Sequence, residues 1–338
     1  MKNLEKPLVA IHCLAYNHEL FIRDCLEGFV MQKTTFPFVA IVHDDASTDG
    51  TAEIIKEYEM KYPGIIKPIY ETTNLYPKSY NDHTLANIML EALKQTGAKY
   101  VAFCEGDDFW IDSHKLQCQV DFLESHPDYT MCFHNAILRY QDTDDADRIM
   151  SNLYTGDYTT YNLLEKWPLP LASIMIRHDV IASDEYRKIT QNNPGGINYF
   201  TVSSLLGKTY CNSKCFSVYR KNKGGASYKM SFDYIINAEL KIYYYFKDKH
   251  IQSIINKRTA LSISSKLPYL VIGGKDSTKG GRSNRFFYGA SRESVIKAIQ
   301  TANRYNKAIV PRAILLFPYV ACDACIRIIK RIFAKKNK

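Results

Sequence analysis

The sequence predicts an α/β fold: a doubly wound, mostly parallel sheet with helices on both faces and a helical extension at the C-terminal end. Two observations lead to this prediction. Short apolar runs, typical of buried parallel strands, alternate with amphipathic helix patterns along the first part of the chain. Polar and acidic residues follow directly after several of these runs, where the loops of a parallel sheet bind ligands. The first four predicted strands are Leu8–Leu14, Phe38–Val42, Ile65–Tyr70 and Tyr100–Cys104.

The first predicted unit is the strand Leu8–Leu14, the turn Ala15-Tyr16-Asn17 and a helix over His18–Gln32. Asn17 is a suitable N-cap for that helix, because its side chain can accept a hydrogen bond from a free backbone N–H of the first turn. The apolar positions of the helix fall on one stripe, so most of them are expected in the core.

The second unit carries an acidic turn after its strand. That turn reads His43-Asp44-Asp45-Ala46-Ser47-Thr48-Asp49-Gly50-Thr51. Asp49 or Ser47 can cap the helix expected over Thr51–Tyr62, which leaves Asp44 and Asp45. A carboxylate at a strand end can accept the imide N–H of uracil or a ribose hydroxyl. The alternative is an acid in a solvated turn. The third strand, Ile65–Tyr70, precedes a helix over Thr84–Lys94.

The central strand, Tyr100–Cys104, ends in the acidic run Glu105-Gly106-Asp107-Asp108. Carboxylates crowded in this way repel one another unless a cation lies between them. Mg²⁺ and Mn²⁺ prefer oxygen ligands of this kind. Asp108 is the best single ligand, and Asp107 is the second candidate. Alternatively the two aspartates only cap the next helix, although Asp112 already offers a cap there.

Further strands are expected over Asp128–Leu138, Leu169–Arg177 and Cys215–Tyr219, with helices over Lys115–Leu123 and Tyr199–Leu206. The last strand leads into a loop with basic residues and glycines, Tyr219-Arg220-Lys221-Asn222-Lys223-Gly224-Gly225. Such a loop suits a phosphate clamp, and a plain surface loop is the alternative.

The formal charge of +9 is concentrated in the tail, where residues 327–338 hold six Lys or Arg and no acid. The body shows no nucleic-acid-binding motif, so no nucleic acid partner is expected. From Val320 onward a helix would place these basic residues beside apolar ones, as in helices that lie on an anionic membrane surface. Docking on its own domain is the alternative. With no signal-peptide pattern and nine scattered cysteines, we expect a cytoplasmic protein held peripherally at the inner face of a membrane. The expected domains are 1–230, a helical and loop extension over 231–308, and the membrane-associating tail 309–338.

Taken in order, these motifs resemble glycosyltransferase family 2 between Pro7 and Ser227. The resemblance rests on Ala15-Tyr16-Asn17, on Asp44-Asp45-Ala46-Ser47-Thr48-Asp49-Gly50, on Glu105-Gly106-Asp107-Asp108-Phe109-Trp110 and, more weakly, on Val218-Tyr219-Arg220. It implies the GT-A fold and the transfer of a sugar, usually with inversion, from a nucleotide-sugar donor to an acceptor hydroxyl. By resemblance, Tyr16 and Asp45 would hold the nucleoside, Asp107 would touch ribose or sugar, and Asp108 would bind Mg²⁺ or Mn²⁺. The candidate donor-binding residues are Ala15, Tyr16, Asn17, Asp44, Asp45, Asp107 and Arg220, and the candidate metal ligands are Asp108 and Asp107.

The sequence departs from the family at two positions. The family's catalytic base, usually an Asp, falls on Asn198, and an amide is not a base at neutral pH. The family's Tyr-Arg-x-His becomes Tyr-Arg-Lys-Asn and ends in Asn222. Asp179, Asp184 or Glu185 could supply the base instead, the alignment could be shifted, or the protein could bind a donor and transfer slowly or not at all.

The leading hypothesis is therefore a metal-dependent glycosyltransferase. It would use a nucleotide-sugar, with a UDP-sugar favoured, and a saccharide or lipid-linked acceptor in surface polysaccharide synthesis. The alternative is a non-catalytic, nucleotide-sugar-binding subunit of a polysaccharide assembly complex, which the amides at Asn198 and Asn222 favour.

Overall fold

The computed structural model describes residues 6–76, 84–166, 169–190, 197–222, 249–267 and 292–316, with single positions between 225 and 247. The chain divides into two compact units, residues 1–222 and 223–338. The domain limits expected at residues 230 and 308 stay predictions.

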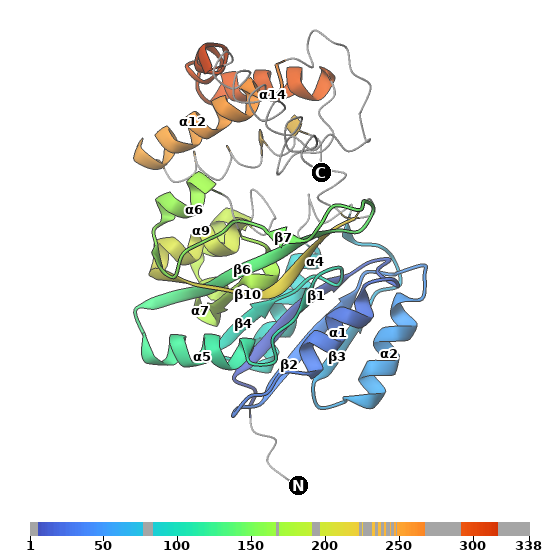
Figure 1. Cartoon of the computed structure of the whole chain (residues 1–338). Helices are drawn as coiled ribbons and strands as arrows, with labels where there is room; N and C mark the ends of the chain where they lie inside the picture. Colours follow the sequence, from blue (N-terminus) through green and yellow to red (C-terminus); the bar gives the residue numbers. More distant parts are fainter. Residues whose placement is uncertain are drawn as a thin grey trace, which may run out of the picture. The chain divides into compact units, whose positions relative to one another are not determined.

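A mixed sheet forms the centre of the first unit (Figure 1). Ten strands lie in its described part, eight of them in the order β3-β2-β1-β4-β9-β6-β10-β5. Strands β3, β2, β1 and β4 run parallel, β9 is antiparallel to β4 and β6, β10 is parallel to β6, and β5 is antiparallel to β10. The strands are β1 (Val9–Ala15), β2 (Phe38–Asp44), β3 (Ile66–Tyr70), β4 (Tyr100–Phe103), β5 (Phe109–Trp110), β6 (Tyr129–Tyr140), β7 (Arg148–Ile149), β8 (Gly156–Tyr158), β9 (Met175–Arg177) and β10 (Lys208–Lys221).

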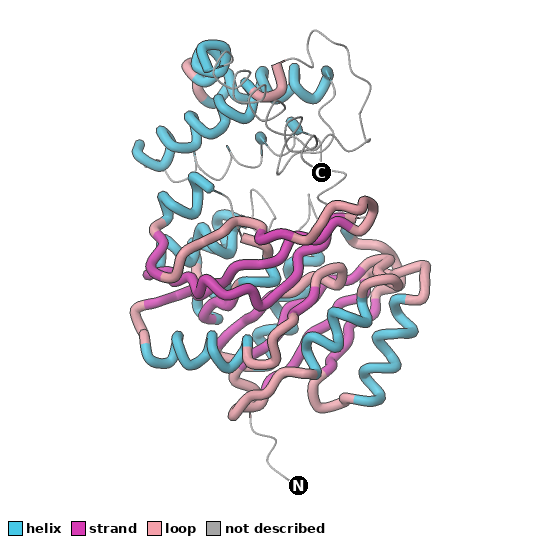
Figure 2. Tube along the Cα trace, in the orientation of Figure 1, coloured by secondary structure: helices cyan, strands magenta, loops and turns pink. Residues whose placement is uncertain are grey.

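Helices flank this sheet on both faces (Figure 2). On one face, α1 (Ile22–Val30), α2 (Thr51–Lys61) and α5 (Lys115–Ser125) pack on alternate residues of β1 and β4. On the other face, α4 (Thr84–Thr96) packs on β1 and β2, and α9 (Ile197–Leu206) packs on β6 and β10. Because both faces are covered, β1 and β4 are almost entirely buried, which explains their near-continuous apolar runs. The short helices α6 (Thr160–Lys166), α7 (His178–Ala182) and α8 (Asp184–Thr190) pack against α9.

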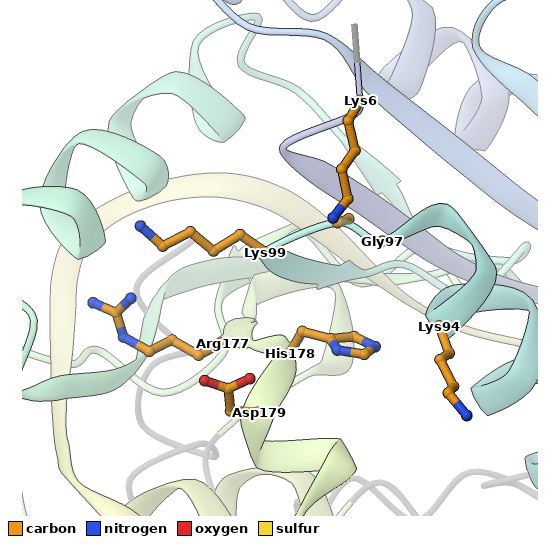
Figure 3. Close-up of a pocket in the computed structure, with 8 residues that line it drawn as sticks. Lys6, Lys94, Gly97, Lys99, Arg177, His178 and Asp179 are labelled. Atoms are coloured by element: carbon orange, nitrogen blue, oxygen red, sulfur yellow. The ribbon is translucent and has the colours of Figure 1, made fainter.

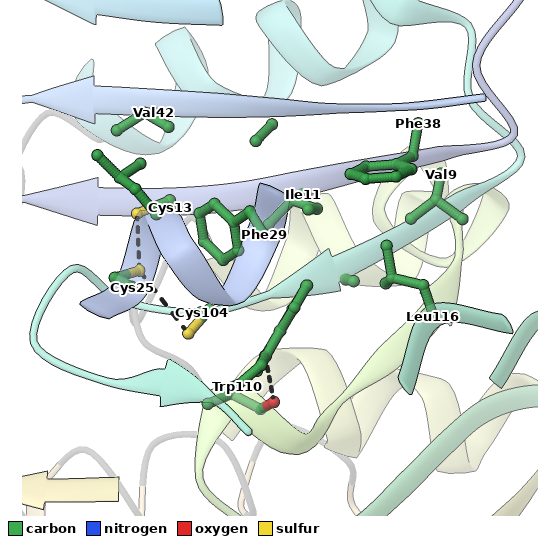
Figure 4. Close-up of a cluster of buried hydrophobic side chains, with 14 of the residues drawn as sticks. Val9, Ile11, Cys13, Cys25, Phe29, Phe38, Val42, Cys104, Trp110 and Leu116 are labelled. Atoms are coloured by element: carbon green, nitrogen blue, oxygen red, sulfur yellow. Dashed lines mark hydrogen bonds between the residues drawn. The ribbon is translucent and has the colours of Figure 1, made fainter. Parts of the chain in front are cut away.

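The core beneath α1 holds the strand that follows the acidic run (Figure 4). The Trp110 ring packs edge-on against Phe29, with ring centroids 5.0 Å apart, and its indole N–H donates to the carbonyl of Ala172 at 2.9 Å. Gly28 of α1 allows this contact, because a Cβ there would lie 2.9 Å from the Trp110 backbone nitrogen. Helix α1 and β5 therefore pack backbone to backbone, which fixes the chain just after Asp108.

The second unit contains the helices α12 (Lys249–Ser264) and α14 (Arg292–Tyr305), which pack on each other. Among the residues that the structure describes, no helix combines the length and apolar character needed to cross a membrane. The expected membrane-associating tail is described only as far as residue 316.

The predicted mixed, mostly parallel sheet is confirmed, with two local corrections. The first helix begins at Ile22 rather than His18, so its N-cap is Phe21 and not Asn17, which lies earlier in a left-handed backbone conformation with φ 54°. The segment Leu169–Arg177 is not one strand, because a 3₁₀ turn, η1 (Leu171–Ser173), precedes β9. The carbonyl of Pro170 accepts bonds from the Ser173 amide and hydroxyl, which stabilise that turn.

Candidate functional site

The candidate residues gather at the carboxyl edge of the sheet, where the loops after β1, β2 and β4 meet. The strand order reverses between β1 and β4, and open α/β sheets bind ligands at such a switch point. The backbone joins the three loops directly. The amide of Asp45 donates to the carbonyl of Ala15 at 2.9 Å, and the amide of Gly106 donates to the carbonyl of Leu14 at 2.8 Å.

Asn17 and Asp44 hold the first two loops in place. The backbone N–H of Asn17 donates to Ser47 Oγ at 2.9 Å, and the side-chain oxygen Asn17 Oδ1 accepts from the Thr48 backbone N–H at 2.8 Å. Asp44 accepts from the amide and hydroxyl of Ser47. The Asn17 side chain thus spans two loops, and an asparagine tolerates the left-handed backbone there. Neither residue needs a ligand to explain its position.

The two other candidates in these loops differ in exposure. Tyr16 is 41% exposed, so its ring can contact a planar base. Asp45 is buried, and its carboxylate accepts from the backbone amides of Leu75 at 2.7 Å and Tyr76 at 2.9 Å. Asp45 therefore fixes the segment after β3. Gly50, not Asp49 or Ser47, is the N-cap of α2, because Asp49 lies one residue too early; its carboxylate accepts from the backbone amide of Thr51 at 3.0 Å.

The acidic run is held by the end of β10. The backbone N–H of Arg220 donates to Asp108 Oδ1 at 2.8 Å, and Asn222 Nδ2 donates to Asp107 Oδ2 at 3.0 Å. Burial, and then the neighbouring Asp107, raise the pKa of Asp108 well above its ordinary value. The same two causes raise the pKa of Glu105 to about 8. Ionised carboxylates are therefore unfavourable here, because they are buried and lie beside one another.

These side chains fit a divalent cation. Each aspartate keeps one carboxylate oxygen that the β10 contacts do not use, and a cation would relieve the repulsion that raises the pKa of Asp108. Within the described ranges, no three His, Cys, Asp or Glu side chains are grouped to enclose a metal. Mg²⁺ characteristically binds through one or two carboxylates, substrate phosphates and water rather than in an all-protein cage. The pair Asp107 and Asp108 matches that donor set.

Arg220 does not present its guanidinium to solvent. The side chain is 4% exposed and forms an ion pair with Asp24 of α1, while Nη1 donates to the carbonyl of Asp107 at 3.2 Å. The guanidinium also lies over the Phe109 ring, 4.2 Å from its centroid. Asp24 and Asn222 were not among the sequence-predicted site residues. The position of Asn222, in place of the family's histidine, is the signal that could have identified it.

His18 is a further residue that the sequence did not single out. A Cβ at Gly106 would lie 2.6 Å from His18 Nδ1, so the imidazole packs directly on the glycine of the acidic run. Burial lowers the pKa of His18, and the carboxylates of Asp107, Asp49 and Asp44 oppose that shift. The sequence could have identified His18 as a candidate site residue, because this histidine directly follows the polar turn Ala15-Tyr16-Asn17 after β1.

The candidates for a catalytic base lie apart from one another. Asn198 is fully buried in the first turn of α9, and Gly195 and Gly196 before it lie outside the described residues. Asp184 has a side chain that is 72% exposed and pairs with Arg187 at 2.9 Å. Asp179 lines, together with Lys99 and Arg177, a hollow of 430 Å³ at the amino edge of the sheet, opposite the acidic run (Figure 3).

Comparisons with known sequences point to one family. The model for glycosyl transferase family 2 matches residues 11–223. The uncharacterized protein Rv1520 of Mycobacterium tuberculosis is 42% identical over 134 residues, which cover 40% of this chain and 36% of that protein. The putative teichuronic acid biosynthesis glycosyltransferase TuaG of Bacillus subtilis is 32% identical over 118 residues, which cover 35% of this chain and 42% of that one. The matched part thus spans well under half the length of these relatives.

Two solved structures share the fold. Staphylococcus aureus TarS residues 1–349, in complex with UDP-GlcNAc, superposes with a TM-score of 0.61 at 16% identity, over 93% of this chain and 86% of that one. The mannosyltransferase PcManGT of Pyrobaculum calidifontis, in complex with GDP-Man and Mn²⁺, gives a TM-score of 0.52 at 15% identity, over 94% of this chain and 80% of that one.

Proposed function

Because this chain belongs to glycosyl transferase family 2 and has a GT-A-like fold, we propose that it transfers a sugar from a nucleotide diphosphate sugar to an acceptor hydroxyl in polysaccharide synthesis. The observation that carries the proposal is the pair Asp107 and Asp108 at the switch point of the sheet. Each carboxylate keeps one oxygen free of the β10 contacts beside the loops that follow β1 and β2.

We assign the following roles to the chain's own residues. Asp108 and Asp107 would hold Mg²⁺ or Mn²⁺, and a cation there would neutralise negative charge on the departing diphosphate. Tyr16 offers its exposed ring to the nucleobase, and Asp45 keeps the segment after β3 in place as a wall of the nucleoside site. Transfer with inversion follows from a hydroxyl that attacks the sugar from the side opposite the diphosphate.

The donor is proposed to be a UDP-sugar. TarS was solved with UDP-GlcNAc, whereas PcManGT was solved with GDP-Man and Mn²⁺. A carboxylate such as Asp45 can accept the imide N–H of uracil. In this structure its two oxygens already accept backbone amides, so uracil would have to share one of them through its second lone pair.

The acceptor is proposed to be a saccharide or lipid-linked oligosaccharide at the inner face of a membrane. The name of TuaG supports a cell-surface polymer. Near the end of the described chain, Ile314 and Leu315 are 58% and 80% exposed beside Arg312, which suits contact with an anionic membrane surface. Deletion of residues 309–338 should abolish co-sedimentation with vesicles of anionic lipid. Undiminished co-sedimentation of the shortened chain would contradict the membrane proposal.

The test is sugar transfer and donor hydrolysis with a panel of nucleotide-sugars, with and without Mn²⁺. Wild-type protein should release nucleoside diphosphate only with metal, and Asp108→Asn should lose this activity. Lys208→Gln is the matched control, since it removes an exposed ion pair with Asp128 in the same unit, at the end of β10 opposite to Arg220. Metal-dependent activity that survives Asp108→Asn would contradict the proposal. Donor binding without turnover across the panel would favour a nucleotide-sugar-binding subunit, to which the amide at Asn198 points.

A further inference from the structure

One buried arginine, Arg220, connects the acidic run to helix α1. The backbone N–H of Arg220 donates to Asp108, and Arg220 Nη1 donates to the carbonyl of Asp107. Its other terminal nitrogen, Nη2, forms an ion pair with Asp24. The guanidinium is enclosed between the rings of Phe109 and Phe21, at 4.2 and 5.4 Å from their centroids.

The counter-charge for this arginine comes from a residue at the surface. The Asp24 side chain is 57% exposed, whereas that of Arg220 is 4% exposed. A buried guanidinium needs a compensating negative charge. Asp24 supplies it from outside the acidic run, so the guanidinium of Arg220 can lie beside Asp107 and Asp108 without forming an ion pair with their carboxylates.

Without Asp24, the nearest compensating charges would be those of Asp107 and Asp108. The guanidinium of Arg220 already donates to the backbone carbonyl of Asp107. The backbone N–H of Arg220 already donates to the carboxylate of Asp108. A guanidinium pairs readily with a carboxylate through two parallel hydrogen bonds. An arginine that turned toward these carboxylates would occupy the oxygens that a divalent cation needs.

We propose that Asp24 is a positioning residue for cation and donor binding. It acts through Arg220 and keeps the arginine's charge paired away from Asp107 and Asp108. This inference rests on the proposed function, since it assumes that the two aspartates bind a divalent cation with the donor diphosphate. It also gives Arg220 a role different from the direct donor contact expected from the sequence.

The experiment titrates Mn²⁺ into wild-type protein and Asp24→Asn in the presence of UDP, with the heat of binding as the readout. The expected result is an Mn²⁺ affinity about tenfold lower for Asp24→Asn, the size typical for losing a residue that orients a metal ligand. Glu57→Gln is the matched control, because it removes the ion pair of Glu57 with Arg23 on the same helix, at similar exposure, far from the acidic run. Its Mn²⁺ affinity should equal that of the wild type.

Two companion measurements keep the inference falsifiable. The melting temperature of Asp24→Asn without ligand should stay close to that of Glu57→Gln, because Arg220, which is 4% exposed, would pair with Asp107 and Asp108 instead of remaining buried without a counter-charge. Arg220→Lys, which keeps the charge but loses the two-pronged geometry, should also weaken Mn²⁺ binding. Equal Mn²⁺ affinity in the wild type, Asp24→Asn and Arg220→Lys would overturn this inference alone. Wild-type protein that binds no Mn²⁺ with UDP would overturn the proposed function as well.

Discussion

Substitution of Gly28 by alanine sets two known effects against each other. Alanine is favoured over glycine inside a helix by about 0.5–1 kcal/mol. A Cβ at this position would lie 2.9 Å from the Trp110 backbone nitrogen and 3.1 Å from its carbonyl oxygen. These are backbone atoms of β5, which pairs with β10, so they cannot rotate away as a side chain would. Overpacking of a tight contact costs about 1–3 kcal/mol, so we expect a net destabilisation of about 1–2 kcal/mol.

The assay is thermal unfolding of Gly28→Ala and of a matched control, Gly64→Ala. No atom lies within 4 Å of a Cβ at Gly64, so the control should melt close to the wild type. For a unit of this size, the expected loss for Gly28→Ala corresponds to a melting temperature lower by about 2–8 °C. Because β5 begins one residue after Asp108, metal-dependent UDP binding should weaken as well. A Gly28→Ala protein as stable as Gly64→Ala, with unchanged UDP binding, would refute the proposed packing.

Two further substitutions test buried polar groups. Asp45→Asn should destabilise the protein by about 1–3 kcal/mol in urea unfolding, because one amide oxygen of the buried side chain replaces two carboxylate oxygens as acceptor for the backbone amides of Leu75 and Tyr76; wild-type stability would contradict that role. Burial lowers the pKa of Lys115, which lies over the Trp110 ring, from 10.5 to about 7. Between these values the unfolded chain binds more protons than the folded one, so stability should rise with pH. Relative to Lys115→Met, the wild type should gain about 2–3 kcal/mol between pH 7 and 9, and parallel pH profiles of the two proteins would exclude a desolvated lysine.

The sequence was sufficient to predict the parts of the fold that depend on local pattern. The runs that became β1, β2 and β4 are apolar because both faces of the sheet are covered, and this signal is visible without a structure. The convergence of their loops then follows from parallel topology alone. The turn at η1 escaped prediction, since apolar residues continue through it and only Pro170 marks the break.

The contacts that define the candidate site could not be predicted from the sequence, for a different reason. Arg220 pairs with Asp24 across 196 positions of sequence, and no periodicity encodes such a pair. The sequence placed Asn17 in the correct loop but predicted that its side chain would cap the following helix. In the structure Asn17 has a left-handed backbone, and its side chain accepts from the backbone N–H of Thr48. Asn222 was noted as a departure from the family pattern, and only the structure shows it donating to Asp107.

The central claim is that Asp107 and Asp108 hold a divalent cation against the donor diphosphate. The most direct test is an anomalous difference map from crystals grown with MnCl₂ and UDP. We predict a manganese peak bonded to a carboxylate oxygen of Asp108 and to diphosphate oxygens, at about 2.0–2.3 Å. UDP bound elsewhere, or bound at the switch point with no manganese peak beside these two aspartates, would contradict the claim.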